Sequence, residues 1–344
     1  MRILLTGAAG FVGGETAARL LERGHEVLGV VHRAREFRAN DGRRLPEGGR
    51  LALVAGDVGR ERLGLDAAAL GPVDLLIHAA AATDFALADE AYARVNVGGA
   101  RNALGLAEAL GCPLLHVGTA YVSGDREGRI RETELDQGQR FTNGYEASKA
   151  EAERLVRAAG ARAAVARPSI VMGDAETGAM RVYGAIPNLF RAMAHGLVPA
   201  LPVAPHATLD VVPVTFVAEA LAAIAERMGQ AAGRAFHVVA AEPLPVGLIR
   251  EAMCEREGLA CPEFVPPGAW SPERLPPRAR RAFEALASVY AGYLSRDPRF
   301  DDRAFRALTG LRAPPADMGY VRRMIERALA VGYLKPSLSP RPAA

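Results

Sequence analysis

The sequence predicts a doubly wound α/β fold, in which helices cover both faces of a parallel sheet, together with a smaller and mainly helical C-terminal part. Two observations predict this class of fold. Short apolar runs alternate with helical patterns through the first half of the chain, and the runs are apolar throughout, as strands are when both faces of a sheet are covered. The expected strands lie near 2–6, 26–31, 51–55, 73–78, 113–118 and 162–167, and the expected helices near 11–23, 59–70, 86–110 and 144–159.

Composition and charge describe an ordinary globular protein. The net charge of +3 is small and the basic residues are scattered along the 344-residue chain, which argues against nucleic acid as a partner. No apolar stretch is long enough for a membrane span or built like a signal peptide, so we expect a cytoplasmic location. Cys112, Cys254 and Cys261 are an odd number without metal-ligand spacing, and we expect reduced thiols.

A glycine-rich turn joins the first expected strand to the first expected helix. Its sequence is Thr6-Gly7-Ala8-Ala9-Gly10-Phe11-Val12-Gly13. Glycines allow a tight turn and a close approach of the backbone to a pyrophosphate, and the helix N-terminus offers free N–H groups and a partial positive charge. Because a strand precedes the turn and a helix follows it, the stretch predicts a dinucleotide-binding Rossmann fold rather than a purely structural turn. The expected cofactor contacts are Thr6, Gly7, Gly10, Phe11, Val12 and Gly13.

The ends of the second and third strands predict how the adenosine half of the dinucleotide is bound. Arg33 follows the second strand, where an acidic residue usually meets a free ribose 2′-hydroxyl and an arginine meets a 2′-phosphate. It therefore favours NADP(H) over NAD(H), unless it is a solvated surface arginine like its neighbours. Asp57, followed by Val58, is expected to accept a hydrogen bond from the adenine amino group or to cap the next helix.

Tyr145 and Lys149 are the predicted chemical centre. They stand four residues apart, which on a helix places both side chains on one face. An ammonium beside a phenol lowers the pKa of the phenol from about 10, so that the tyrosine can exchange a proton with a substrate oxygen. Only Lys149 and Lys335 among the 42 basic residues are lysines, which indicates that arginine does not serve at position 149. The alternative is an accidental pair on a helix surface.

Two further polar residues complete the expected site. Thr119 ends the strand near 113–118, at the sheet edge where ligands bind in such folds, and is expected to donate a hydrogen bond to a substrate carbonyl. Asn96 is expected to hold helix backbone and a water in the proton path, unless it is an ordinary polar residue near the end of an element. No histidine has a spacing to Glu or Cys that suits a metal, so we expect no metal site.

The chain beyond Arg167 is organised differently. Proline and glycine become frequent through 173–213, a strand-like stretch at 209–214 leads into a helix near 215–228, and one more strand is expected near 235–239. We expect an NADP-binding domain over 1–172 with sheet elements returning at about 208–240, a substrate-binding part over 173–207 and 241–334, and a flexible tail over 335–344.

Taken together, these residues resemble the extended short-chain dehydrogenases/reductases. The matching positions, within residues 1 to about 240, are 6–13, Asp57, 78–81, Asn96, Thr119, Tyr145, Lys149 and 167–170. The resemblance implies that Thr119, Tyr145 and Lys149 form the catalytic set, with Asn96 beside them. It also implies cofactor contacts for Ala79, Ala80, Ala81, Pro168, Ser169 and Ile170, of which the last three line the nicotinamide pocket.

A narrower resemblance is to fatty acyl-CoA reductases and thioester-reductase domains. It is carried by 77–85, 116–122, 210–214 and 290–308, although Gly118 stands where those proteins usually have serine. It implies an NADPH-dependent reductase of lipid metabolism. The substrate would be a fatty acyl thioester of coenzyme A or an acyl carrier protein, and the product an aldehyde or alcohol. A homodimer through the helices near 86–110 and 144–159 is a further expectation.

Other functions stay open for the same residues. A ketone or hydroxysteroid dehydrogenase and a nucleotide-sugar epimerase or dehydratase would both use Tyr145 and Lys149. A non-enzymatic nucleotide sensor on this fold would need neither residue.

Overall fold

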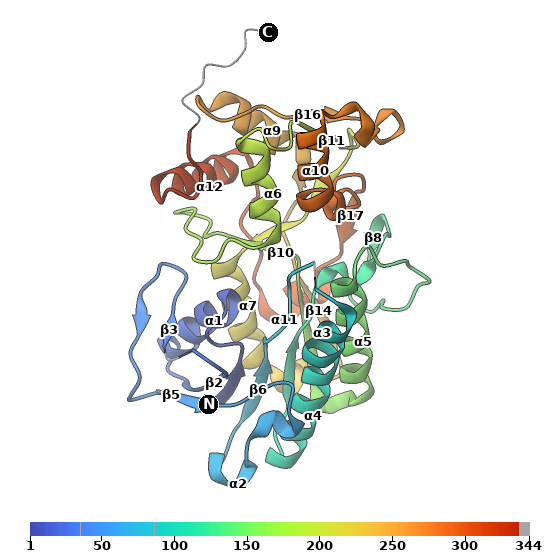
Figure 1. The fold of residues 1–344 in the computed structure, drawn as a ribbon. Helices are drawn as coiled ribbons and strands as arrows, with labels where there is room; N and C mark the ends of the chain where they lie inside the picture. The colour runs from blue at the N-terminus through green and yellow to red at the C-terminus, as the bar shows by residue number, and fades with distance from the viewer. Residues whose placement is uncertain (35, 86, 337–344) are drawn as a thin grey trace.

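The computed structural model describes residues 1–34, 36–85 and 87–336, and a seven-stranded sheet lies at its centre (Figure 1). The strand order is β14-β9-β7-β6-β1-β2-β5, and every neighbouring pair is parallel. The strands are β1 (Arg2–Thr6), β2 (Glu26–Val31), β5 (Leu51–Ala55), β6 (Leu75–His78), β7 (Leu114–Val117), β9 (Ala163–Pro168) and β14 (Ala235–Val238). The predicted doubly wound fold is confirmed, and the predicted strands of the first half all lie in this sheet.

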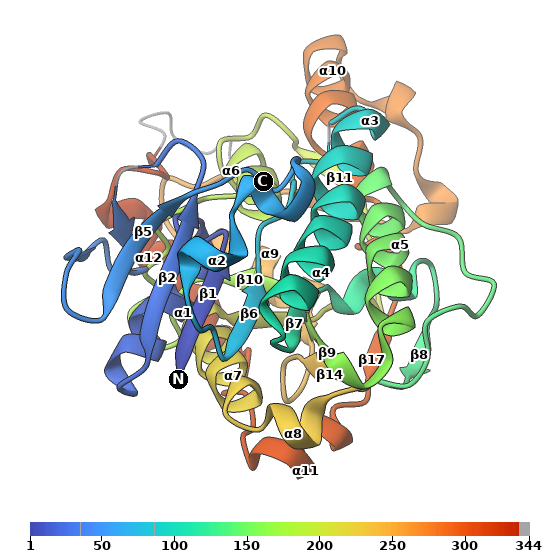
Figure 2. The same ribbon diagram turned by 90° about the horizontal axis from the view of Figure 1, so that it is seen from below.

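Helices cover both faces of the sheet, as Figure 2 shows from below. One face carries α1 (Phe11–Glu22), α7 (Val214–Ala225) and α11 (Arg303–Thr309), and the other carries α4 (Gly98–Leu110) and α5 (Gly144–Ala158). Within β1, Ile3 and Leu5 are buried under the first group, whereas Leu4 is buried under the second. Because both faces are covered, the strand has no polar side, which explains its uniformly apolar sequence.

The strand order reverses between β1 and β6. From β1 the sheet continues through β2 in one direction and through β6 in the other. At such a switch point the connections that follow the two strands leave in opposite directions and open a crevice at the carboxyl ends of the strands. Thr6 and His78 are register partners at the ends of these two strands, so the glycine-rich turn and residues 79–82 meet at this crevice.

Two expected helices differ from their predictions. The segment near 59–70 contains only a short 3₁₀ helix η1 (Glu61–Gly64) and α2 (Ala67–Leu70). Arg62 and Leu63 adopt positive φ values of 47° and 61°, which interrupts a regular helix. The segment near 86–110 is helical from Asp89, but α3 (Asp89–Tyr92) continues into α4 through a π-helical segment η2 (Ala93–Val97). Residue 86 lies outside the described residues.

The C-terminal part packs above the carboxyl ends of the sheet around a core of its own (Figure 1). Its main helices are α6 (Ala185–Ala194), α9 (Val246–Glu255), α10 (Pro277–Leu286) and α12 (Met318–Ala330). Four short two-stranded pairs lie within this part or join it to loops above the sheet. They are β10 (Ile170–Met172) with β13 (Val211–Pro213), β11 (Ala200–Pro202) with β16 (Glu263–Val265), β12 (Thr208–Leu209) with β15 (Leu244–Pro245), and β17 (Pro298–Phe300) with β8 (Gly128–Ile130).

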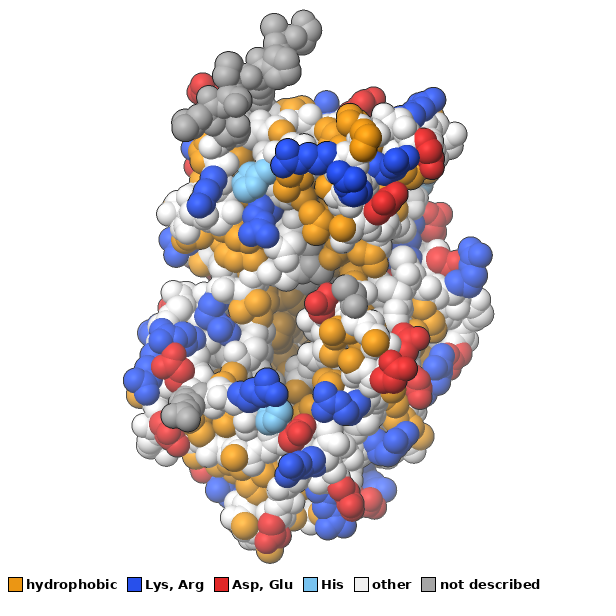
Figure 3. Space-filling model, in the orientation of Figure 1, with side chains coloured by type: hydrophobic (Ala, Val, Ile, Leu, Met, Phe, Trp, Pro, Cys, Tyr) orange, Lys and Arg blue, Asp and Glu red, His pale blue; other side chains and the backbone are white. Residues whose placement is uncertain are grey.

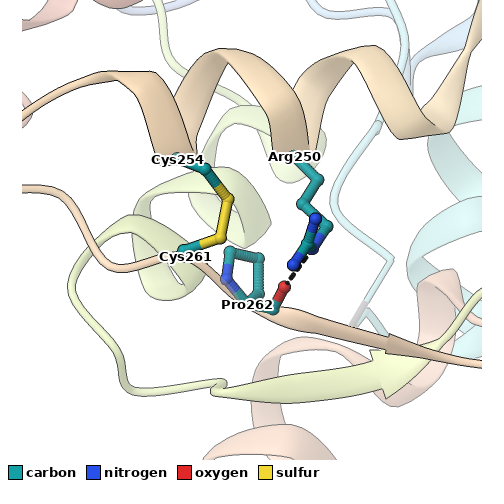
Figure 4. Close-up of a disulfide and its surroundings, with 4 residues drawn as sticks. All are labelled: Arg250, Cys254, Cys261 and Pro262. Carbon is teal, nitrogen blue, oxygen red and sulfur yellow. Dashed lines mark hydrogen bonds between the residues drawn. A yellow bond between two sulfur atoms is a disulfide. The ribbon is translucent and has the colours of Figure 1, made fainter. Parts of the chain in front are cut away.

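The prediction of three reduced cysteines is wrong. Cys254, at the end of α9, forms a disulfide with Cys261 (Figure 4). On the same helix, Arg250 Nε donates a hydrogen bond to the carbonyl oxygen of Pro262 at 2.7 Å, so two covalent or polar links tie α9 to the segment that follows it. The two cysteines are seven residues apart, and the turn after α9 brings them together, which spacing alone did not indicate. Cys112 is the free cysteine, and burial raises the pKa of its thiol to about 11.

None of the helices in the described part of the chain is both long and apolar enough to cross a bilayer. The tail predicted over 335–344 lies, from residue 337 on, outside the described residues.

Candidate active site

A cleft of about 580 Å³ lies between the carboxyl ends of the sheet and the C-terminal part. Figure 3 shows a hollow between the two halves of the molecule with hydrophobic side chains on its walls. The cleft brings together most of the predicted site residues. Those in its wall are Gly7, Gly10, Phe11, Val12, Gly13, Ala79, Ala80, Ala81, Thr119, Tyr145, Lys149, Pro168, Ser169 and Ile170.

The glycine-rich turn forms one end of the cleft with no room for side chains. Gly7 has a φ of +70°, and a Cβ on Gly13 would lie 2.1 Å from the carbonyl oxygen of Gly7. Gly10 is the N-cap of α1 and offers no capping side chain, so the first N–H groups of the helix have no side-chain acceptor there. An exposed helix N-terminus beside these glycines, with the Arg181 guanidinium on the carbonyls of Ala9 and Gly10, fits the pyrophosphate of a dinucleotide.

Tyr145 and Lys149 reach the cleft from the first turns of α5. The helix starts where it does because the Asn143 side chain accepts a hydrogen bond of 2.9 Å from the N–H of Glu146. One turn separates the two side chains, and both line the cleft. Lys149 Nζ donates a hydrogen bond to the Val117 carbonyl oxygen at 2.7 Å. Burial lowers the pKa of Lys149 to about 8, against an opposing effect of Glu153.

The expected effect of Lys149 on the acidity of Tyr145 is wrong for this structure. Burial raises the pKa of Tyr145 to about 12, and a hydrogen bond with the Thr119 side chain opposes this rise only in part. The ring of Phe85 lies 5.6 Å from that of Tyr145, so the phenol is enclosed by apolar surface. The Lys149 ammonium is instead bound to a strand carbonyl. Tyr145 is therefore a neutral phenol at pH 7, able to give a proton.

Thr119 lies in the wall of the cleft, whereas Asn96 lies behind it. Thr119 is buried in the cleft wall at the end of β7 and also caps the 3₁₀ helix η3 (Ala120–Ser123). Asn96 does not line the cleft. Its side chain accepts from the N–H of Ala82 at 2.8 Å and donates to the Ala82 carbonyl and to Ser148 Oγ at 2.9 Å. It thus ties the loop after β6 to the helix that carries Tyr145 and Lys149.

The remaining predicted cofactor contacts lie outside the cleft wall. The Thr6 hydroxyl accepts from the N–H of Ala80 at 3.2 Å and bonds to His78, so it shapes the crevice floor. Arg33 is exposed just beyond β2. Asp57 accepts from the N–H of Gly59 at 2.8 Å, which makes a turn rather than a cap of an α-helix. The Val58 carbonyl accepts from the Asn102 side chain.

Histidine 78 is part of a buried pair. Its ring stacks on that of His116 with 5.5 Å between centroids, and burial lowers the pKa of both. Within residues 1–34, 36–85 and 87–336, no group of three or more His, Cys, Asp or Glu side chains is arranged to hold a metal ion.

Sequence reasoning missed an aromatic wall opposite the predicted residues. Phe85, Tyr121 and Tyr293 line the cleft, and the ring of Tyr293 lies 5.1 Å from Tyr121 and 6.0 Å from Phe85. Tyr293 comes from far along the chain, and its sequence indicates only a family resemblance. No local pattern marks it as a site residue, because the contact depends on how the C-terminal part folds over the sheet.

A buried hydrogen-bond network connects this wall to the catalytic helix. The Tyr293 hydroxyl donates a hydrogen bond of 2.5 Å to Oε1 of Glu146. Glu146 follows Tyr145 directly in the chain. Arg296 donates to the same oxygen at 3.3 Å, and its guanidinium lies 4.8 Å from the centre of the Tyr293 ring. Glu146 is fully buried, so its carboxylate oxygens depend on these donors for hydrogen bonds.

Comparison with known proteins agrees with this architecture. The family described as Male sterility protein matches residues 5–221, which is well over half of the chain. The crystal structure of the terminal R domain from the myxalamid PKS-NRPS biosynthetic pathway superimposes with a TM-score of 0.83 and 25% identity, covering 98% of this chain and 92% of that one. MoeE5 in complex with UDP-glucuronic acid and NAD shares the fold, with a TM-score of 0.70 and 20% identity over 96% of this chain and 100% of that one.

Among curated proteins, 3 beta-hydroxysteroid dehydrogenase/Delta 5-->4-isomerase of Mycobacterium tuberculosis is 29% identical over 259 residues. The match covers 71% of this chain and 66% of that protein, just under two thirds of its length. The family match and the seven-stranded fold together show that the chain belongs to the Male sterility protein family, within the extended short-chain dehydrogenases/reductases, and has an NAD(P)-binding domain.

Proposed function

We propose that this protein is an NADPH-dependent reductase that converts a fatty acyl thioester to an aldehyde or, in a second round, to an alcohol. The observation that carries the proposal is the composition of the cleft. It joins a pyrophosphate cradle, two hydroxyl donors and a buried amine to a wall of aromatic and apolar side chains. The likeness to the myxalamid R domain over 98% of this chain supports the same reaction class.

Thr119, Tyr145 and Lys149 have different roles in the proposed reaction. In the proposed reaction, a bound nicotinamide dinucleotide supplies the hydride to the thioester carbonyl carbon. Thr119 and Tyr145 donate hydrogen bonds to the carbonyl oxygen, and Tyr145 gives up its proton as negative charge develops there. The positive charge of Lys149, which the Val117 carbonyl holds in the cleft wall, favours the negative charge that develops on the carbonyl oxygen. The carbon–sulfur bond then breaks, the hydroxyl proton passes to the sulfur, and the thiol leaves while the aldehyde remains. A proton from solvent restores Tyr145. The net reaction consumes one NADPH and one proton.

The preference for NADPH rests on Arg33. It is exposed directly beyond β2, where a 2′-phosphate calls for a positive charge, and His32 before it lies 3.9 Å from the Asp57 carboxylate. The Arg33→Ala variant should weaken NADPH binding about tenfold and leave NADH binding unchanged, because one charge-assisted contact contributes about 1.5–3 kcal/mol before solvent screening. Titration of the two nucleotides by fluorescence measures both affinities.

A carrier protein is the proposed partner when the thioester is protein-bound. Arg274, Arg278 and Arg281 are exposed on and just before α10, and α10 leads into Tyr290, whose ring lies 5.5 Å from Phe85 in the cleft. This basic surface suits an acidic carrier domain. The division of the chain into a cofactor domain over 1–172 and a substrate-binding part over 173–207 and 241–334 belongs to the same proposal, as does a homodimer.

A second candidate is a hydroxysteroid or ketone dehydrogenase. It is favoured by the 29% identity to the mycobacterial 3 beta-hydroxysteroid dehydrogenase/isomerase, and the same Thr119 and Tyr145 would serve a ketone oxygen. A nucleotide sugar, as in MoeE5, is less well supported because the wall opposite Tyr145 is mainly apolar.

A cofactor-oxidation screen separates these candidates. Purified protein is mixed with NADPH or NADH and with acyl-CoA thioesters, acyl carrier thioesters, 3-ketosteroids and UDP-sugars. Loss of absorbance at the nicotinamide band with thioesters, together with release of free thiol, supports the proposal. Turnover of steroids alone, or of no thioester in the panel, refutes it.

A further inference from the structure

The C-terminal part contains a second cavity that the proposed chemistry does not use. It has a volume of about 60 Å³ and lies between α6, α9, α12 and β13. Four methionines line it, namely Met172, Met180, Met253 and Met324, together with aliphatic and aromatic side chains. Within the described part of the chain, Arg191 is the charged residue in this wall, and its guanidinium lies 4.9 Å from the centre of the Tyr333 ring. A polar ligand would find almost no partner there.

The cavity lies directly beside the reaction cleft. Met180 and Pro187 belong to both walls, so one layer of side chains separates the two spaces. Methionine is unbranched and has three rotatable bonds, so it can move aside at low energetic cost. A rotation of the Met180 side chain would join the cavity to the cleft.

We propose that this methionine-lined cavity binds the distal end of an unbranched aliphatic acyl chain whose thioester lies at Thr119 and Tyr145. The inference rests on the proposed function and adds the place where the acyl chain binds. A hydroxylated or charged group would be left unpaired in this wall, at a cost of about 1–3 kcal/mol for each polar group. A rigid fused-ring substrate could not enter through one rotated side chain, whereas a flexible chain can.

The lining explains how a small space accepts a longer ligand. Met253 and Met324 come from α9 and α12, which pack on each other, and their side chains can give way without moving either helix. Each methylene that leaves water for this wall gains up to about fourfold in binding. Reactivity should therefore rise with chain length until the cavity is full.

Position 328 provides the sharpest test. Ala328 is buried on α12 and lines the cavity, whereas Ala330 lies two residues further on the same helix and is exposed. Ala328→Phe fills the cavity, and Ala330→Phe makes the same chemical change facing solvent. Ala328→Val is a milder second variant in case the larger ring disturbs folding, which thermal unfolding of each variant would reveal.

Two measurements give independent answers. In the first, kcat/KM is determined for butanoyl-, octanoyl- and dodecanoyl-CoA. We expect Ala328→Phe to lose at least tenfold with dodecanoyl-CoA and less than twofold with butanoyl-CoA, Ala328→Val to lose about threefold with the long chain, and Ala330→Phe to match the wild type. Equal losses at all chain lengths in a folded Ala328 variant would overturn the inference.

The second measurement needs no turnover. The fluorescent fatty acid cis-parinaric acid is titrated into each protein in the presence of NADPH. Binding by the wild type and Ala330→Phe, and at least tenfold weaker binding by Ala328→Phe, supports the acyl site. Equal binding by all three proteins refutes it. Absence of thioester reduction with parinarate binding intact would refute the proposed function alone.

Discussion

The two ends of the cleft are built in different ways. At the cofactor end the wall is largely backbone: a turn in which a Cβ on Gly7 or Gly13 would collide with neighbouring main chain, and a helix N-terminus without a capping side chain. At the substrate end the wall consists of side chains from segments far apart in sequence, including Phe85, Tyr121 and Tyr293. A backbone wall admits one kind of ligand, whereas a side-chain wall can be altered residue by residue. The comparison indicates that cofactor binding is fixed by the fold and that substrate choice is set by side chains from both parts of the chain.

Removing the hydroxyl that lies between the two ends should have the largest effect. Tyr145→Phe keeps the ring against Phe85 but removes the proton donor, so we expect kcat to fall about 10²–10⁴-fold with little change in NADPH affinity. Steady-state kinetics and nucleotide titration check the two statements. Full turnover in this variant would exclude Tyr145 as the acid.

A methyl group added at the cofactor end should weaken the binding of NADPH. Gly13→Ala places a Cβ 2.1 Å from the Gly7 carbonyl oxygen, and relieving such a clash costs about 1–3 kcal/mol, or roughly ten- to hundredfold in NADPH affinity. The control is Gly105→Ala, in the interior of α4, where a Cβ meets nothing within 4 Å. It should bind NADPH normally and be more stable by about 0.5–1 kcal/mol. Equal affinities in the two variants would contradict a cradle for pyrophosphate.

At the substrate end, the hydroxyl of Tyr293 positions the catalytic helix through Glu146. Tyr293→Phe leaves a buried carboxylate with one donor fewer, so we expect kcat/KM for the thioester to fall about tenfold and stability to fall by about 1–3 kcal/mol, with NADPH affinity unchanged. Tyr290→Phe is the matched control, since Tyr290 packs on the same Phe85. A parallel loss of NADPH affinity in Tyr293→Phe would show that the two ends are not independent.

The pH dependence of the reduction rate tests the role of the Lys149 charge. Tyr145, with a pKa of about 12, stays protonated through the accessible range, whereas Lys149, with a pKa of about 8, loses its charge as the pH rises. Reduction should therefore be constant below pH 7 and fall about tenfold per pH unit above pH 8. In Lys149→Arg the charge persists, so kcat/KM should be lower overall but should not decline between pH 8 and 10. A decline of equal slope in both proteins would assign it to another group.

Removing the disulfide above the substrate end should affect ligand binding least. Closing a short loop such as 254–261 contributes about 2–3 kcal/mol in the chain-entropy account. For the Cys254→Ser/Cys261→Ser protein, urea denaturation should give a free energy of unfolding that is lower by that amount. NADPH affinity should stay normal, because the disulfide lies in the C-terminal part. Reductant should destabilise the wild type but not the double variant.

Sequence patterns predicted the strands of the sheet well and one helical segment and the pKa of Tyr145 poorly. Strands such as β1 and β6 are marked by their own residues, because burial on both faces demands a continuous apolar run. The segment near 59–70 was misjudged because Arg62 and Leu63 adopt positive φ values in the folded protein. The pKa of Tyr145 was predicted in the wrong direction because its pattern reveals the neighbouring lysine but not the burial that outweighs it.

The sequence by itself determined the fold class, the glycine cradle and the Tyr145/Lys149 pair, since each depends on spacing within one turn, strand or helix. Only the tertiary structure decided that Tyr293 and Arg296 hold Glu146, that Cys254 meets Cys261, and that four methionines enclose a cavity beside the cleft. These features join segments up to about 150 residues apart, and such contacts follow from packing rather than from any local periodicity.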